Sequence, residues 1–249
     1  MTKVDDIYDN QEIVPKARGS IHKVIIEWLC TQPRGKLLDV PAGYGHLSMK
    51  LKELGYEVVC GEIEPEIFKV KGIECIFTDL NRNIPAPDGS FDYVCCVEGL
   101  EHMTDPYRAV EEFSRVLKPG GCGIFSIPNY SNIEKRFRYF ITGSLTKPKT
   151  VEDYKNAGSR LFNFHNSPLT ITILDLIFSI NGLQIEAILR NKIKKRQYLF
   201  FPLVAVMKMA AFFSSDRSRR KYRYDVTLRD EVILGGNTLI FIVRRTRKS

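Results

Sequence analysis

Residues 36–45, which read KLLDVPAGYG, decide the fold. The first half, from Lys36 to Val40, is a short apolar run of the kind that forms a buried parallel strand. The second half is a turn of small residues, and a helical pattern from His46 to Leu54 follows it directly. A buried strand that passes through a glycine-rich turn into a helix predicts the first unit of an open α/β sheet.

The alternation of strands and helices continues along the chain. Further strands are predicted from apolar runs at 57–61, 74–78, 91–97, 122–127, 183–189 and 238–244. Helices between them are predicted at 65–70, 105–117 and 170–180. Pro119-Gly120-Gly121 is expected to stop the second of these helices. The pattern predicts an α/β fold, a Rossmann-like doubly wound seven-stranded sheet that is mostly parallel, with an antiparallel last strand and helices on both faces.

Length and composition favour one domain over the whole chain, 1–249. The chain has 249 residues, 44% of them hydrophobic and 27% charged, which is enough for a sizeable core without metal or disulfide support. Three additions to the domain are expected: an N-terminal helical cap (1–34), a polar and aromatic lid (129–168), and an apolar and basic insertion (191–236).

The cysteines and the N-terminus predict a cytoplasmic protein. Six cysteines are present, none of them in a CxxC pair, and most fall in predicted strands, as buried free thiols do. Such usage fits a reducing compartment. The first 30 residues carry Asp5, Asp6, Asp9 and Glu12 and no apolar core of a signal peptide, so we expect no secretory signal.

Two acidic residues are expected beside the glycine-rich turn. Glu62 ends the second strand about 20 residues after the turn, where a carboxylate can accept hydrogen bonds from both hydroxyls of a ribose. Asp79 ends the third strand, where a carboxylate can reach an adenine amino group. Ligands of open parallel sheets bind outside the carboxyl ends of the strands. The turn and the two carboxylates therefore predict an adenosine site, with the unpaired N–H groups of the following helix as additional donors.

Three blocks in this order resemble the class I S-adenosylmethionine-dependent methyltransferases. Residues 38–45 (LDVPAGYG) resemble motif I of that family, and residues 91–102 (FDYVCCVEGLEH) resemble its strand-four block. Residues 115–121 (RVLKPGG) are similar to the turn before its fifth strand. The resemblance covers 36–127 and is strongest to the small-molecule branch that includes ubiquinone-type O-methyltransferases and polysaccharide-cluster methyltransferases.

The resemblance implies S-adenosyl-L-methionine as the cofactor. Asp39 and the backbone at Gly43 would hold its methionine part, and Val97 and Glu98 would lie beside the sulfonium. The full set of implied cofactor contacts is Asp39, Ala42, Gly43, Gly45, Glu62, Asp79, Leu80, Val97 and Glu98. One departure from the family pattern is Pro41-Ala42 in place of Gly-Cys or Gly-Ser, because proline has no N–H to donate.

Histidine is the natural base for methyl transfer to a hydroxyl near neutral pH. His102, after the fourth strand, and His165, before the helix at 170–180, are the predicted catalytic residues, and the resemblance places a histidine similar to His165 at the substrate. His22 and His46 are expected on the surface. Substrate contacts are predicted from Asn129, Tyr130, Arg136 and Arg138, since arginine forks suit phosphate or carboxylate groups. No metal is expected.

The net charge of +8 and the pI of about 9.1 come largely from two clusters near the C-terminus. The clusters are Lys192, Lys194, Lys195 and Arg196, and Arg217, Arg219, Arg220, Lys221 and Arg223. The apolar run Tyr198–Phe213 between them is shorter than the roughly 20 residues of a membrane-spanning helix. We expect 191–223 to form a peripheral contact with the inner face of the membrane or to cover an apolar substrate tunnel. The alternative is a helix packed on the core or on a dimer partner.

The expected function is therefore methyl transfer to a small-molecule, glycan or lipid-linked acceptor, at a hydroxyl oxygen. The basic charge suggests an alternative, an RNA or protein methyltransferase, although the sequence has no Asn-Pro-Pro-Tyr motif and no appended nucleic-acid module. A third alternative is a non-catalytic adenosine-binding protein at a membrane, for which Pro41 is the support. The sequence leaves the oligomeric state open.

Overall fold

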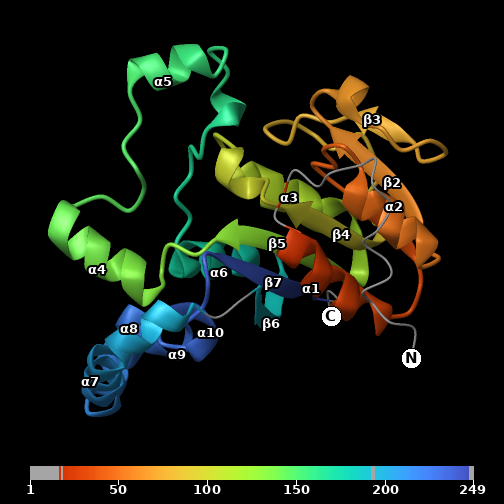
Figure 1. The fold of residues 1–249 in the computed structure, drawn as a ribbon. Coiled ribbons are helices and arrows are strands. Elements are labelled where there is room, and N and C mark those ends of the chain that lie inside the picture. Colours follow the sequence, from red (N-terminus) through yellow and green to blue (C-terminus); the bar gives the residue numbers. More distant parts are fainter. Residues whose placement is uncertain (1–16, 18, 192–193, 247–249) are drawn as a thin grey trace.

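The computed structural model describes residues 17, 19–191 and 194–246. In this part of the chain seven strands form one sheet in the order β3-β2-β1-β4-β5-β7-β6 (Figure 1). Strands β1 to β5 run parallel, and β7 is antiparallel to both β5 and β6. The predicted fold class is confirmed. The strands are β1 (Lys36–Asp39), β2 (Glu57–Glu62), β3 (Cys75–Phe77), β4 (Phe91–Val97), β5 (Leu117–Pro128), β6 (Leu183–Arg190) and β7 (Thr238–Arg245).

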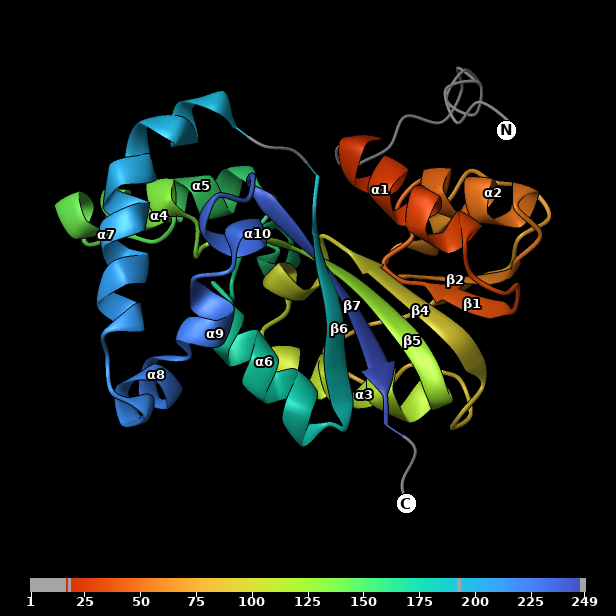
Figure 2. The same cartoon turned by 90° about the horizontal axis from the view of Figure 1, so that it is seen from below.

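Helices α1 (Gly19–Cys30) and α2 (His46–Glu53) cover one face of the sheet, and α3 (Pro106–Val116) and α6 (Ile171–Ile180) cover the other (Figure 2). Side chains alternate between the two faces, as strand geometry requires. On β4, Tyr93 and Cys95 pack toward α1 and α2, whereas Val94 and Cys96 pack toward α3 and α6. Both faces of the central strands are buried, which is why these strands read as unbroken apolar runs.

Strand β5 begins earlier than predicted. Helix α3 ends at Val116, and β5 starts at the next residue instead of after the Pro-Gly-Gly sequence. Leu117 pairs with Phe91, but the next pair is Tyr93 with Cys122, so residues 118–121 bulge out of the register. The bulge accommodates Pro119, which has no N–H to donate to a ladder. The helix predicted at 65–70 is likewise shorter and forms only the 3-10 turn η2 (Pro65–Ile67).

The predicted lid, 129–168, contains short elements that extend away from the sheet (Figure 1). They are α4 (Ile133–Thr142), α5 (Val151–Asn156) and the 3-10 turn η4 (Leu161–Asn163). The end of the lid is hydrogen-bonded to the loop 100–103, which includes the 3-10 turn η3 (Leu100–His102). Ser167 N–H donates to Glu101 O, and Ser167 Oγ donates to Met103 O. The side-chain amide of Asn166 donates to His102 O. These bonds fix the last part of the lid against the end of β4.

The insertion between β6 and β7 is helical. Its elements are the 3-10 turn η5 (Lys195–Phe200), α7 (Phe201–Phe212), α8 (Asp216–Tyr222), α9 (Tyr224–Thr227) and α10 (Asp230–Ile233). Ile133 of α4, Val204 of α7 and Ile233 of α10 form a small core that joins the insertion to the lid. No described helix is long and apolar enough to cross a bilayer. Lys192 of the first basic cluster, and residues 1–16 and 18 of the predicted cap, lie outside the described residues.

Candidate functional site

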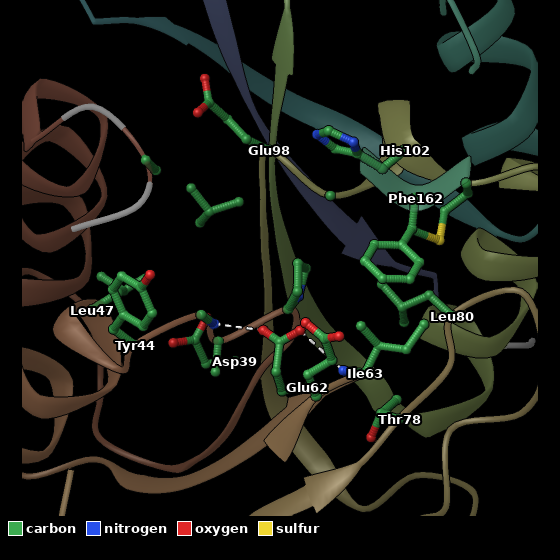
Figure 3. A pocket seen from close by; sticks show the side chains of 18 of the residues that line it. Asp39, Tyr44, Leu47, Glu62, Ile63, Thr78, Leu80, Glu98, His102 and Phe162 are labelled. Carbon is green, nitrogen blue, oxygen red and sulfur yellow. Dashed lines mark hydrogen bonds between the residues drawn. The ribbon is translucent and has the colours of Figure 1, made fainter. Parts of the chain in front are cut away.

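A cavity of about 310 Å³ lies outside the carboxyl ends of β1, β2 and β4 (Figure 3). Asp39, Glu62 and Asp79, which the sequence assigns to three different strand ends, all line it. Of the remaining residues predicted to bind a cofactor, Ala42, Gly43, Leu80, Val97 and Glu98 also line it. Gly45 does not line it but caps α2 with a φ of 90°, and a Cβ there would lie 2.5 Å from Val70. The function of Gly45 is thus to allow the turn itself.

The N–H groups of the glycine-rich turn are used inside the protein. Gly43 N–H donates to Glu62 Oε2 at 2.7 Å, Ala42 N–H to Gly61 O, and Gly45 N–H to Ala42 O. These three N–H groups are therefore not free for a ligand, whereas the donors expected from the sequence are the first N–H groups of α2, which follow the turn. Because a phosphate cradle needs free N–H donors, the turn does not form one with these three groups. It instead fixes the Glu62 carboxylate, whose Oε1 also accepts from Ile63 N–H at 3.0 Å.

Asp39 is the most deeply buried carboxylate of the cavity wall. It accepts a hydrogen bond from Ser48 Oγ at 2.5 Å. Burial raises the pKa of Asp39 to about 7, with a further upward contribution from Glu62, while the Ser48 bond opposes the shift. A carboxyl whose pKa is raised on folding contributes stability below its unfolded value, near 4, and this contribution is lost as the pH rises through about 7. The ionised side chain of Asp39 therefore destabilises the protein at pH 8.

Asp39→Asn is expected to stabilise the protein, and to do so more at high pH. The amide keeps an acceptor for Ser48 Oγ but has no charge to bury. Thermal unfolding followed by circular dichroism measures the difference in melting temperature between the variant and the unsubstituted protein. We expect this difference to be several degrees larger at pH 8 than at pH 4.5. The exposed Asp216→Asn is the matched control and should show no such trend. A difference for Asp39→Asn that stays the same at both pH values would contradict this assignment.

One end of the cavity is lined by apolar side chains. Ile63 follows β2, Leu80 follows β3, and Phe162 reaches in from η4 of the lid, and Figure 3 shows the three together beside Glu62. Asp79, next to Leu80, is held by the N–H of Asn81 at 3.0 Å and by Arg82 at 3.4 Å. An apolar slot with a fixed carboxylate on each side suits the planar ring and the sugar of a nucleoside. Phe162 is a lining residue that the sequence did not predict.

The charge of the cavity favours a cation. Five carboxylate residues line it, and no lysine or arginine is among the described residues that do so: Asp39, Glu62, Glu64, Asp79 and Glu98. The lining histidines add little positive charge, because burial lowers the pKa of His22 to about 4 and also lowers the pKa of His46 and His102. Arg160 pairs with Glu64, Arg82 pairs with Asp79, and burial raises the pKa of Asp39, but the wall as a whole stays acidic and favours a positively charged ligand over a dinucleotide pyrophosphate.

The opposite end of the cavity is formed by the residues after β4. Glu98 adopts a φ of 49°, which is rare for a residue with a side chain and is typical of functional sites. Its N–H donates to Ser126 Oγ at 2.9 Å. The next residue must be glycine, because a Cβ on Gly99 would lie 2.6 Å from the ring of Pro41. Pro41 therefore packs against the loop after β4. This contact shows how the structure accommodates Pro41-Ala42 where the similar family turn has Gly-Cys or Gly-Ser.

The two predicted catalytic histidines are brought together. His102 lines the cavity, and its ring lies edge-on to that of His165 with 4.8 Å between centroids. His165 Nδ1 lies 3.2 Å from the hydroxyl of Tyr130. The buried Glu101 is next to them, and neither of its carboxyl oxygens has a hydrogen-bond partner among the described residues. Glu101, His102 and His165 each offer an atom within 4.8 Å of the others, an arrangement that can share a proton or hold a metal ion.

Burial sets the protonation states of this cluster. It raises the pKa of Glu101 to about 8, so the carboxyl is largely neutral at pH 7. It lowers the pKa of His102, and burial together with the neighbouring His102 lowers the pKa of His165. Both imidazoles are thus neutral near pH 7 and can accept a proton. When one of them does so, Glu101 can ionise beside it and stabilise the imidazolium.

The expectation that His22 and His46 lie on the surface is wrong. Both are buried, line the cavity near the turn, and have their Nδ1 atoms 3.1 Å apart. The two rings are stacked with 5.3 Å between centroids. The sequence carries a signal for His22, which shares one helix face with Ile25, Ile26 and Leu29 through spacings of three and four.

The residues predicted to bind substrate do not gather at the cavity. Arg136 donates to the carbonyl oxygens of Ser131 and Thr227, and Arg138 donates to Leu145 O. Asn129 is buried, and its amide donates to Val232 O at 2.9 Å. These three side chains satisfy backbone carbonyls, so the structure does not favour a substrate contact for them. Of the four, only Tyr130 lies next to the histidines predicted to be catalytic.

Sequence comparison finds similarity to methyltransferases in the part of the chain that contributes most of the residues lining the cavity. The family described as the methyltransferase domain matches residues 38–125, which contain the turn, Glu62, Asp79 and the β4 block. A ubiquinone biosynthesis O-methyltransferase of Xanthomonas campestris is 33% identical over 106 residues, which are 39% of this chain and 44% of that protein. The match to this relative thus spans less than half of its length, and the family match ends at residue 125, before the insertion.

Solved structures share the fold over nearly the whole chain. The YcgJ protein of Bacillus subtilis aligns with a TM-score of 0.57 at 18% identity, covering 93% of this chain and 100% of that one. The cyclase SpnF aligns with a TM-score of 0.53 at 17% identity, covering 95% of this chain and 86% of that one. Because one of these neighbours is named a cyclase, the fold by itself does not specify a reaction.

Proposed function

Residues 38–125 match the family described as the methyltransferase domain, and from this premise we propose that the protein is a class I S-adenosylmethionine-dependent methyltransferase, which transfers a methyl group to a hydroxyl oxygen of a small-molecule, glycan or lipid-linked acceptor. The observation that carries the proposal is the cavity: carboxylates line it, its described wall contains no lysine or arginine, and the N–H groups of Ala42, Gly43 and Gly45 already donate within the protein. These features fit a nucleoside that bears a sulfonium and do not fit a nicotinamide dinucleotide.

The residues present fit S-adenosyl-L-methionine part by part. Glu62 has one oxygen fixed by Gly43 and the other by Ile63, which leaves further lone pairs on both for the ribose hydroxyls. Ile63, Leu80 and Phe162 would enclose the adenine, with Asp79 at its edge. Asp39 and Glu98 would face the ammonium and the sulfonium.

The cofactor supplies an activated methyl carbon on sulfur, so the protein has to align the acceptor and remove its proton. Alignment of reacting groups in a closed site can lower a barrier by roughly 7–11 kcal/mol. The lid can exclude water from the cavity, since Phe162 lines it and Arg160 pairs with Glu64 at its rim. His165 is proposed as the base, with Nδ1–H donating to Tyr130 and Nε2 accepting the proton of the acceptor.

Two measurements test the proposal. Isothermal titration calorimetry should detect binding of S-adenosylmethionine and no binding of NAD. Transfer of labelled methyl into a cell extract should then place the label in solvent-extractable or low-molecular-weight material. Label in RNA or protein would instead support the alternative acceptors, and binding without any transfer would support the non-catalytic alternative. Failure to bind S-adenosylmethionine would refute both enzyme hypotheses.

A further inference from the structure

Helix α7 is apolar on all sides and yet lies at the surface. Its sequence, FPLVAVMKMAAF, contains one charged residue, and Val204 is its only buried side chain. Phe212 is 71% exposed, and the following Phe213 is 79% exposed. A helix that is hydrophobic all round is normally buried in a core or in lipid. The structure therefore leaves α7 without the environment that its composition requires.

The lid helix α4 extends this surface. Tyr139, Phe140 and Ile141 at its C-terminal end are exposed, Phe140 by 85%. Phe137 of α4 contacts Phe200, with 5.4 Å between ring centroids, and both views show α4 and α7 at the same end of the molecule (Figures 1 and 2). We call this surface the α4–α7 face; its exposed apolar residues are Phe137, Tyr139, Phe140, Ile141, Tyr198, Leu199, Phe201, Leu203, Val206, Met209, Phe212 and Phe213.

Positive charge adjoins the α4–α7 face. Helix α8 directly follows α7, and its Arg217, Arg220 and Lys221 are exposed and form no ion pair within the described part of the chain. Arg219 and Arg223 serve the fold instead: Arg219 donates to the last carbonyls of α7, and Arg223 pairs with Asp175 and Asp225. The unpaired basic residues are the charge that an anionic lipid headgroup complements.

We propose that the α4–α7 face docks the protein peripherally on an anionic lipid bilayer. The apolar side chains enter the boundary between headgroups and acyl chains, and Arg217, Arg220 and Lys221 contact the headgroups. A second copy of the chain fits this face less well, because an isologous dimer would oppose two surfaces of like charge. This docking does not depend on the identity of the methyl acceptor.

Docking would place the membrane next to the lid. Asn132 caps the N-terminus of α4; its side chain donates to Gly236 O at the base of the insertion and accepts from Lys135 N–H. Lys194 and Arg196 pair with Glu134 on the same helix. Through these contacts α4 and the insertion form one unit at the end of β5, near the residue Tyr130. An apolar acceptor leaving the bilayer would meet the lid first.

Flotation of the full-length protein with vesicles tests the proposal. The protein should float with vesicles of phosphatidylcholine and phosphatidylglycerol, and at least tenfold less with phosphatidylcholine alone. Phe212→Ser/Phe213→Ser and Arg217→Glu/Arg220→Glu/Lys221→Glu should each lower the bound fraction at least tenfold. The matched control is Ile180→Ser, which removes a side chain that is 63% exposed at the end of α6; its binding should stay within twofold.

Circular dichroism and calorimetry with S-adenosylmethionine should be unchanged in all variants, so that loss of docking is separated from unfolding and from failure of the cofactor site. Equal binding of both vesicle types, or full binding of both variants, would overturn the proposal. The proposal would also be overturned if the unsubstituted protein failed to bind vesicles and formed a dimer in light scattering that Phe212→Ser/Phe213→Ser dissociates.

Discussion

Replacing Glu62 with alanine is expected to weaken the binding of S-adenosylmethionine by about 100-fold or more. The substitution removes the carboxylate that we propose as the acceptor of two ribose hydroxyls, and each hydrogen bond to a charged group contributes about 1.5–3 kcal/mol. It also leaves the N–H groups of Gly43 and Ile63 without their acceptor, so the turn loses its fixed position. Isothermal titration calorimetry measures the change directly.

Two further variants make the result specific. Glu62→Gln keeps the size of the side chain and one acceptor oxygen, so we expect a smaller loss of affinity than for alanine. Glu66→Ala removes an exposed carboxylate on the neighbouring turn η2, which does not line the cavity, and should leave the affinity unchanged. Adenosine should lose affinity in parallel with S-adenosylmethionine, because both carry the ribose. A folded Glu62→Ala protein that binds within threefold of normal would remove Glu62 from the site.

The central strands could be predicted from the sequence because their signal is local. Strand β4 spans the residues predicted for it, Phe91–Val97, since every residue of a strand that is buried on both faces has to be compatible with the core. The start of β5 could not be predicted in this way. Pro119-Gly120-Gly121 signals a break in local structure, but only the pairing with β4 determines that the break is a bulge within a strand.

The cofactor side of the site was predictable for a related reason. Parallel strands place their carboxyl ends on one edge, so Asp39, Glu62 and Asp79 converge whatever the details of packing. The histidine cluster is different, because Glu101 and His165 are brought together by tertiary contacts between the β4 loop and the end of the lid. Residue type was enough to predict His102 and His165 separately as catalytic residues. That Tyr130 is the hydrogen-bond partner of His165 could be seen only in the structure.

The arginines show where residue chemistry alone misleads. A guanidinium binds carbonyl oxygens as readily as it binds anions. Thr227 O at the end of α9 has no partner within its helix, and Arg136 donates to it. The sequence reveals the donor capacity of Arg136, but the acceptor is determined by which helix end packs beside it. The same holds for Arg138 and Leu145 O.

His165→Asn is expected to lower the rate of methyl transfer by about 10²–10⁴-fold, the range for loss of a general base. Asparagine can still donate to Tyr130 but cannot accept a proton at neutral pH. The affinity for S-adenosylmethionine should stay within twofold, because His165 does not line the cavity. Added imidazole should restore part of the rate, which a purely structural defect would not allow.

The pH profile separates this base from a bound metal. Since burial and His102 lower the pKa of His165, the rate of the unsubstituted enzyme should have an acidic limb that lies below the ordinary pKa of histidine, about 6.5, well separated from the titration of Glu101 near pH 8. His165→Asn should lose that acidic limb, and Tyr130→Phe should keep it at a reduced rate. EDTA should leave transfer unchanged. Loss of activity in EDTA that a divalent ion restores would mean that Glu101, His102 and His165 act as metal ligands. An unaltered rate in His165→Asn would exclude His165 both as a base and as a metal ligand.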